Sequence, residues 1–276
     1  MRQSRQSSVP STPSRLFVPL RLSRRGADAA APVSLSERAY TAIREEILRG
    51  QLRPGTPLSR RRLARELGMS VLPVTDALRR LEVDGLVESR ARAGTRVRVP
   101  SDADIHALYE LREALETQAA RLFARKATPA ERLELKVLAG QVDTLFSRLP
   151  ASDDPDFRFR VHSQHVRLHM FIAQHARSRL LGEMIERNHV LILNWLFDVG
   201  ARRTPLPRHF HTRLVDALVS GDPDAADAAM RAHVQYGLSE IAGNFDALTA
   251  SEWRERRGRV ALNGSHENTK SRRNKS

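Results

Sequence analysis

The chain has 276 residues and a formal net charge of +14, a length that suggests two domains. It contains no cysteine, which excludes disulfide bonds and thiolate metal ligands. Hydrophobic residues make up 41% of the chain and aromatic residues only 5%, a mixture that favours helices over sheets. No apolar run reaches the roughly 18 residues of a membrane span, and no apolar signal segment follows the basic N-terminus. We therefore expect a cytoplasmic protein.

The positive charge is distributed unevenly along the sequence. Residues 1–33, 34–100 and 251–276 carry net charges of +5, +6 and +5, whereas residues 101–250 carry −2. The two terminal segments have little apolar surface to bury, so we expect disordered basic tails that either solubilise the protein or contact DNA in a salt-sensitive way. The charge of residues 34–100 indicates a nucleic-acid partner. The near-neutral region that follows needs a different function.

Residues 34–100 carry signals for three short helices. Leu35, Ala39, Ile43 and Ile47 recur every four residues and predict one face of a helix over 35–48. A turn at 53–55 leads to a second helix over 59–67, which a glycine ends. The third helix begins at Ser70 and ends before Gly85; Pro73 is compatible with its first turn. Two short helices around a glycine turn are typical of a helix-turn-helix.

Two β-prone segments, 86–89 and 95–99, follow the third helix. Residues 91–94 can turn between them, so the pattern predicts a two-stranded wing. In the second segment Val97 and Val99 share one face, while Arg96 and Arg98 share the other. The expected fold of this region is therefore a winged helix-turn-helix.

The order and spacing of four motifs in this region resemble the DNA-binding domain of the GntR family. They read G-x-L-x-P-G-x-x-L, L-A-x-x-L-G, P-V-x-x-A-L-x-x-L and G-L-V-E…G-T-x-V. The chain departs from the family where a Ser-Arg pair usually opens the third helix, because Ser70-Val71 stands there. Thr75-Asp76 replaces a usual Arg-Glu pair, and Arg60 replaces a usual glutamate. The resemblance implies DNA binding, and the departures imply an operator different from the commonest type.

We expect the DNA contacts to come from the second and third helices and the wing. Leu72 can contact a thymine methyl group, and Thr75 can bond to a base edge or a phosphate. Asp76 can accept from cytosine or repel phosphate. The basic run at 60–62 either contacts phosphates or is a solvated face. The predicted DNA-binding residues are Arg60, Arg61, Arg62, Ser70, Leu72, Pro73, Thr75, Arg79 and Gly94.

Residues 101–250 predict an antiparallel all-helical bundle. Breaks at Thr128-Pro129, at 150–155, at 204–207 and at 221–223 separate periodic apolar segments, and no β-prone stretch interrupts them. The predicted helices cover 102–127, 129–148, 154–176, 178–199, 206–220 and 222–248. The complete chain is therefore expected to be mainly α-helical.

Four histidines are predicted to face the interior of this bundle. His165 and His169 are four residues apart, so they lie on one helix face, which continues through apolar positions. His211 and His233 share stripes with leucines, valines and methionine of two further helices. Four imidazoles in a dry core are costly, and coordination of a metal ion would satisfy them. Other histidines, at 162, 175, 189 and 209, are expected at the surface or lining a pocket.

The helical region also resembles the FCD ligand-binding domain of one branch of the GntR family. The segments IHALYELREALETQAARLFA, RLHMFIAQHARSRLL and HTRLVDALVSGDPDAADAAMRAHV carry the resemblance. Members that bind metal use an aspartate and three histidines; those positions are His165, His169, His211 and His233 here. The resemblance implies a divalent ion, zinc first, with nickel or copper as alternatives. A metal-free pocket of polar histidines remains the alternative.

Together these patterns predict a ligand-responsive transcription regulator. Arg112 matches a family arginine near the cavity and would pair with a small organic acid, unless it forms an ordinary salt bridge with Glu110, Glu113 or Glu116. We expect a homodimeric repressor that binds a pseudo-palindromic double-stranded operator and is released by a carboxylate effector. A zinc hydrolase is disfavoured because Val166 stands where a zincin has its glutamate. We therefore expect no enzymatic activity.

Overall fold

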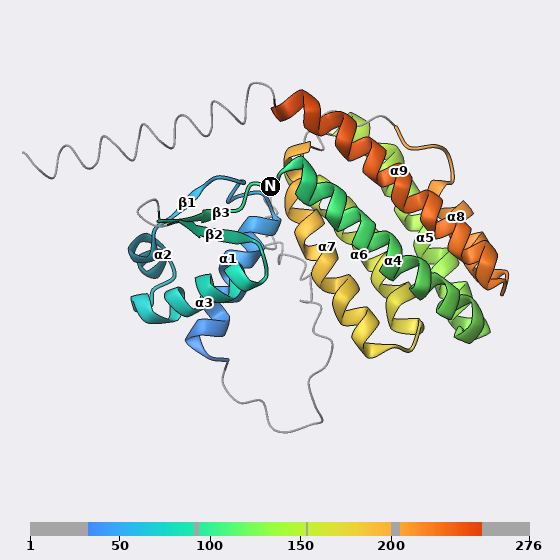
Figure 1. The fold of residues 1–276 in the computed structure, drawn as a ribbon, viewed down its shortest axis with the longest axis horizontal. Coiled ribbons are helices and arrows are strands. Elements are labelled where there is room, and N and C mark those ends of the chain that lie inside the picture. The colour runs from blue at the N-terminus through green and yellow to red at the C-terminus, as the bar shows by residue number, and fades with distance from the viewer. Residues whose placement is uncertain (1–32, 91–93, 153, 200–204, 250–276) are drawn as a thin grey trace, which may run out of the picture. The chain divides into compact units, whose positions relative to one another are not determined.

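The computed structural model describes residues 33–90, 94–152, 154–199 and 205–249 (Figure 1). The two predicted tails, 1–33 and 251–276, lie outside the described residues except for Val33. Most of the predicted wing turn, at 91–93, also lies outside them. The described part is mainly helical with one small antiparallel sheet, which confirms the expected fold class.

Three helices form the core of the region that begins at Leu35. They are α1 (Leu35–Leu48), α2 (Arg60–Glu66) and α3 (Val71–Val83). The apolar faces predicted from spacing are buried together: Ile43 and Ile47 of α1 pack with Leu78 and Leu81 of α3 in one cluster. Ser59 caps α2 by accepting a bond from Arg62 N, and Ser70 is the N-cap residue of α3. The helix-turn-helix is therefore present as predicted.

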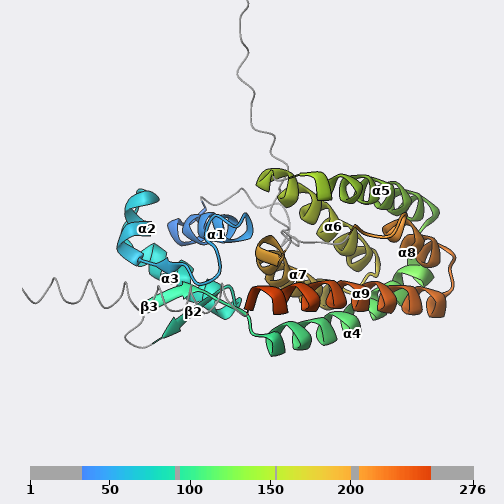
Figure 2. The same cartoon turned by 90° about the horizontal axis from the view of Figure 1, so that it is seen from above.

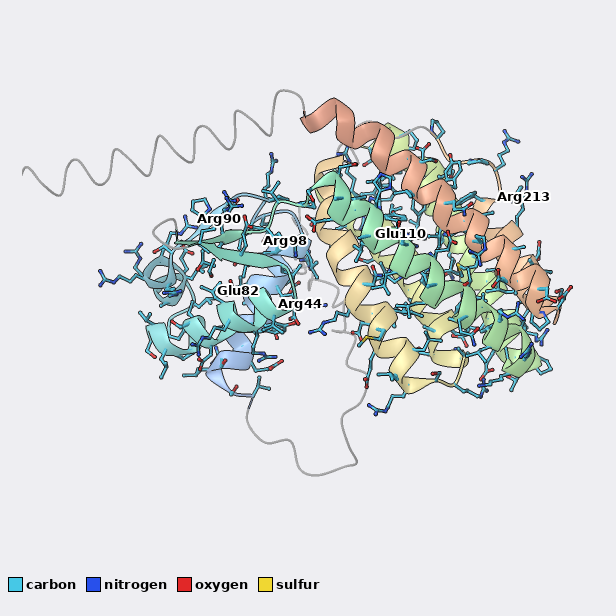
Figure 3. The ribbon with its side chains drawn as sticks, in the orientation of Figure 1. Arg44, Glu82, Arg90, Arg98, Glu110 and Arg213 are labelled. Atoms are coloured by element: carbon cyan, nitrogen blue, oxygen red, sulfur yellow. The ribbon has the colours of Figure 1, made fainter. Side chains whose placement is uncertain are left out.

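The sheet has three strands, one more than the sequence suggested. The wing consists of β2 (Val87–Arg90) and β3 (Gly94–Val97), paired antiparallel with Val87 opposite Val97. The added strand β1 (Pro57–Leu58) pairs with the other edge of β3. Two residues are too short to show a strand periodicity, so this pairing is visible only in the folded structure. Glu82, labelled in Figure 3, accepts from Ser89 N at 3.0 Å and so ties the end of α3 to β2.

Within its described residues, the second region contains six longer helices and one short 3₁₀ helix. They are α4 (Asp102–Lys126), α5 (Pro129–Arg148), η1 (Leu149–Ala151), α6 (Pro155–His175), α7 (Arg179–Val199), α8 (Phe210–Val219) and α9 (Pro223–Thr249). Five of the α-helices match the predicted spans to within one residue at each end. The exception is α8, which begins four residues later than predicted, after a left-handed residue at His209.

The helices pack as an antiparallel bundle around the side chains that form the site. The long helices α4 and α9 lie side by side and run in opposite directions (Figure 1). Seen from above, α6 lies between α5 and this pair (Figure 2). The central position of α6 places its inward face where α4, α8 and α9 also contribute side chains. No helix in the described part of the chain is both long and apolar enough to cross a bilayer.

Candidate functional sites

Four imidazole side chains from three helices converge inside the bundle. His165 and His169 lie one turn apart on α6, His211 lies in the first turn of α8, and His233 lies on α9. The Nε2 atoms of His165, His169 and His233 form a triangle with sides of 2.9, 3.2 and 3.3 Å. The ligand atom of His211 lies within 4.8 Å of those of His165 and His233. The four histidines that the sequence predicted thus lie together.

Asp143 of α5 fixes the orientation of His211. Its carboxylate accepts a bond from His211 Nδ1 at 2.8 Å and further bonds from the backbone N–H groups of His211 and Thr212. The Thr212 hydroxyl donates a fourth bond. Although burial opposes it, these bonds hold the pKa of Asp143 below its ordinary value, so the carboxylate is ionised and can only accept. His211 therefore carries its proton on Nδ1 and leaves the Nε2 lone pair free for a ligand.

Glu116 of α4 has the same effect on His169. Its carboxylate accepts from His169 Nδ1 and from Arg112 Nε, and all three side chains are almost fully buried. Burial alone would raise the pKa of Glu116, but Arg112 and His169 hold it well below the ordinary value. His189 Nε2 lies 3.1 Å from Glu116 Oε1, the oxygen that accepts from Arg112, but the geometry is not that of a hydrogen bond. Glu116 is thus the centre of a buried charged cluster beside the histidines.

Burial favours the neutral form of three of these imidazoles, those of His165, His169 and His233. It lowers the pKa of His169 to about 3, although Glu116 opposes the shift. Burial and the neighbouring histidines lower the pKa values of His165 and His233 well below 6.5. Neutral imidazole is the form that binds metal ions. At neutral pH these three imidazoles therefore present unprotonated nitrogen atoms rather than positive charge.

The spacing of these nitrogen atoms suits a small divalent cation. Zinc–nitrogen bonds of about 2.0–2.1 Å place neighbouring ligand atoms about 3.3 Å apart in a tetrahedral site and about 2.9 Å apart in an octahedral one. The three measured separations fall in that interval. A carboxylate behind a ligating imidazole is also the usual outer partner at metal sites, and Glu116 and Asp143 occupy that place. The residues present therefore fit a metal ion.

Arg112 already contacts one of these nitrogen atoms. Its Nη2 atom lies 3.2 Å from His169 Nε2, the nitrogen that completes the triangle. Its side chain is only 4% exposed, and its Nε is bonded to Glu116. The salt bridge with Glu116, one of the alternatives left open by the sequence, is therefore formed. An incoming carboxylate can use Arg112 only by sharing or replacing these partners.

A small cavity of about 50 Å³ lies against the histidine cluster. That volume holds one or two water molecules or a few ligand atoms. Its walls are mostly aromatic, with Phe210 stacked on His233 at a ring distance of 4.8 Å. The cavity is lined by Tyr109, Arg112, Phe146, His165, Val166, His189, Leu206, Phe210, His211, His233, Tyr236, Gly237 and Glu240.

The remaining histidines of the bundle have different surroundings. His189 lines the cavity as the sequence allowed, but its contact with Glu116 was not foreseen. Contrary to the expectation of a surface or pocket-lining position, His162 is buried and is not among the residues that line the cavity; its ring lies at a right angle to Phe146. His209 is exposed, and His175 is partly exposed with Nδ1 2.8 Å from a backbone carbonyl oxygen. Asp143 gave no sequence signal, because its two partners lie 68 and 69 residues further along the chain.

The nine predicted DNA-binding residues lie on α2, α3 and β3. Arg60, Arg61 and Arg62 are all exposed in the first turn of α2, with Arg62 3.7 Å from Glu66. On α3, Ser70 is the N-cap residue without a side-chain capping bond, Leu72 and Arg79 are exposed, and Pro73 is partly buried. The Thr75 hydroxyl donates to Val71 O at 2.9 Å. Gly94 opens β3 with a φ of 77°, a conformation that favours glycine.

The fold and the two sites together define a class of protein. A basic helix-turn-helix with a β wing, followed in the same chain by a helical bundle with a buried polar pocket, is the architecture of a two-part transcription regulator. Comparison with known families agrees with this. The family described as "Bacterial regulatory proteins, gntR family" matches residues 35–97, and the "FCD domain" family matches residues 107–236. The chain belongs to the GntR family, in the branch that carries an FCD domain.

Individual relatives support the same assignment. The chain is 29% identical over 207 residues to the "Probable D-xylose utilization operon transcriptional repressor" of Paenarthrobacter nicotinovorans, covering 73% of this chain and 88% of the relative. It is 26% identical to the transcriptional repressor RspR of Escherichia coli, covering 73% and 86%. The solved structure of E. coli McbR/YncC shares the fold, with a TM-score of 0.63 at 23% identity over 77% of this chain and 99% of that one. The matched family is one of regulatory proteins and both named relatives are transcriptional repressors, so this chain is a transcription regulator rather than an enzyme.

Proposed function

We propose that the protein is a homodimeric repressor that a small carboxylate releases from its operator. Residues 34–100 would form the DNA-binding domain and residues 101–250 the domain that binds the effector and the second subunit. Two of its relatives are named repressors, which supports repression rather than activation. Two identical DNA readers would bind a pseudo-palindromic site in adjacent major grooves. Because operator DNA lies in the bacterial cytoplasm, we place the protein there.

The observation that carries the sensing part is the convergence of the four histidines. Three Nε2 atoms lie 2.9–3.3 Å apart, and two of the imidazoles are held by Asp143 and Glu116 with that nitrogen unprotonated. We infer that His165, His169, His211 and His233 bind one divalent ion, with zinc favoured and nickel or copper as alternatives. A bound ion would supply a positive centre for the oxygen atoms of an acid.

In this proposal, effector binding changes operator affinity through the helices that supply the histidines. α6, α8 and α9 each contribute at least one histidine, so a ligand that enters the cavity contacts three elements at once. We propose that effector binding changes how these helices pack and thereby the placement of the two DNA readers. The shift cannot exceed the difference in the effector's affinity for the two states.

A second candidate is a pocket that works without metal. The contact of Arg112 Nη2 with His169 Nε2 favours it, because the arginine already satisfies the nitrogen that the ion would need. In that case Arg112 and the histidines would contact the carboxylate directly. Both candidates give the same function and differ only in the cofactor.

Measuring operator affinity in the presence of simple carboxylic acids tests whether a carboxylate controls DNA binding. A site selected from random DNA with the full chain is labelled, and its Kd is measured by fluorescence anisotropy with zinc-loaded protein. Acetate, malonate and citrate are then added as probes of increasing size and charge. We expect at least one of them to weaken binding about 5-fold or more. Equal Kd values with every carboxylate would refute effector control and leave DNA binding intact.

The proposed DNA-binding surface has its own test. A variant that combines Arg61→Ala and Thr75→Ala removes one exposed guanidinium and one side chain of α3. We expect weaker binding of the selected operator and a smaller dependence of Kd on salt, since a phosphate contact is lost. Glu66→Ala, which changes the same helix α2 without removing a donor, serves as the control. Binding as tight as that of the parent would mean that these residues do not contact DNA.

A further inference from the structure

The outer face of α3 carries an exposed apolar side chain at each end. Leu72, Asp76, Arg79 and Val83 follow one another at intervals of three and four residues, so they share one face, opposite the buried residues of the helix. Leu72 is 71% exposed and Val83 is 75% exposed. Leu72 lies in the first turn, the part of a recognition helix that contacts base edges. The residue at the reading position is therefore a solvent-exposed leucine.

The first two turns of α3 contain no side chain that can donate two hydrogen bonds to guanine. The first basic residue of the helix is Arg79, in the third turn. Arg80 is engaged elsewhere, since it donates to Glu37 at 2.8 Å and its guanidinium stacks on Tyr40 at 4.1 Å. The Thr75 hydroxyl donates its proton to Val71 O within the helix. Readout by this end of the helix must therefore use apolar contact and hydrogen-bond acceptors.

The major groove offers one apolar group to such a surface. Thymine carries a C5 methyl group there, whereas guanine presents two acceptors and cytosine an amino donor. A leucine gains by covering a methyl group, by about 0.8 kcal/mol for each buried carbon, or about fourfold in affinity. The carboxylate of Asp76, one turn further along the same face, repels the two acceptors of guanine and can accept from an amino group.

We propose that Leu72 reads a thymine methyl group in each operator half-site and that Asp76 excludes guanine next to it. The operator is then recognised at this end of α3 by a methyl group instead of by arginine contacts to guanine. This inference rests on the operator binding proposed above and adds its chemistry. It follows from the exposure of Leu72 and from the engagement of the neighbouring polar side chains.

Replacing thymine by deoxyuridine tests the inference, because this removes the methyl group and keeps every hydrogen bond. An operator is selected from random DNA with the full chain, and each thymine of a half-site is substituted in turn. We expect at least one thymine whose substitution weakens binding about 3- to 5-fold. With Leu72→Ala the thymine and deoxyuridine sites should bind equally. Val83→Ala, which shortens an exposed residue at the far end of the same helix, should keep the discrimination.

The possible results separate this inference from the proposed function. A parent protein that binds every deoxyuridine site as tightly as the thymine site overturns the methyl readout but leaves operator binding in place. Discrimination that survives Leu72→Ala assigns the readout to another residue and also overturns it. If the full chain enriches no sequence at all, operator binding itself fails, and the inference fails with it. Circular dichroism of both variants confirms that the exposed substitutions leave the helices intact.

Discussion

Replacing Glu116 with glutamine tests how the buried cluster holds the bundle together. Glutamine keeps the size of the side chain and one carbonyl acceptor but removes the negative charge. Arg112, whose side chain is 4% exposed, and the fully buried ring of His169 both donate to this carboxylate. The substitution therefore leaves the buried guanidinium of Arg112 without its counter-charge. It also removes the carboxylate that holds the proton of His169 on Nδ1.

The expected loss of stability is large because water cannot replace the missing charge. Removing one partner of a buried ion pair costs about 3–5 kcal/mol, and the remaining carbonyl acceptor places Glu116→Gln near the lower end. The sign of the pH dependence follows from the lowered pKa of Glu116. The carboxylate stabilises the fold fully above its unfolded-state value of 4.5 and loses this contribution as the pH falls through the folded-state value. The difference in the free energy of unfolding between the parent and Glu116→Gln should therefore become smaller at acidic pH.

Urea unfolding at neutral and acidic pH, in the presence of a chelator, measures both effects. Glu113→Gln is the matched control, since Glu113 lies on the same helix and pairs with Arg231, whose side chain is 45% exposed. A partly exposed pair of this kind contributes about 0–1 kcal/mol. If Glu116→Gln is no less stable than Glu113→Gln at neutral pH, the buried cluster does not have the role assigned to it.

Three further predictions concern the cavity, the metal ligands and pH. Gly237→Ala adds a methyl group 3.4 Å from Tyr109 Cε1, so we expect unchanged or higher thermal stability, because alanine favours the helix, together with a weaker response of operator affinity to carboxylates. Asp143→Asn should lower zinc affinity about 10- to 100-fold in a competition titration, because it no longer fixes the tautomer of His211. Thr212→Val, which removes only one bond to the same carboxylate, should retain zinc. The metal-free chain should lose stability as the pH falls below about 6.5, by about 1.4 kcal/mol per pH unit for each buried imidazole, because the unfolded chain takes up protons that the buried imidazoles do not. A melting temperature that is constant between pH 7.5 and 5 would contradict this last prediction.

The helices could be predicted because residues close together in the sequence determine where each helix begins and ends. Ser101 and Thr128 each form a capping box with an acidic residue three positions later, and both helices begin where the sequence predicted. β1 could not be predicted, because a two-residue strand depends on its pairing with β3, almost 40 residues later. The late start of α8 likewise depends on the left-handed conformation of His209.

The four histidines of the site could be predicted, but the acidic residues that support them could not. The spacing of His165 and His169 on one helix face, and the resemblance of the later segments, identified the four histidines that the structure brings together. Glu116 entered only as one of three partners for Arg112, and Asp143 did not enter at all. Their partners are distant in sequence, so only the packing of α4, α5, α6 and α8 joins them. The pairing of acidic residues with buried histidines therefore becomes visible only in the tertiary structure.

The metal content of the purified full chain tests the central claim most directly. The protein is incubated with zinc, nickel or copper, desalted, and analysed for metal beside a variant that combines His169→Ala and His233→Ala. His175→Ala, which changes a partly exposed histidine outside the cluster, is the control. The four-histidine pocket predicts one equivalent per chain in the parent and in the control, and none in the double variant. No bound metal in the parent, or equal amounts in the parent and the double variant, would contradict it.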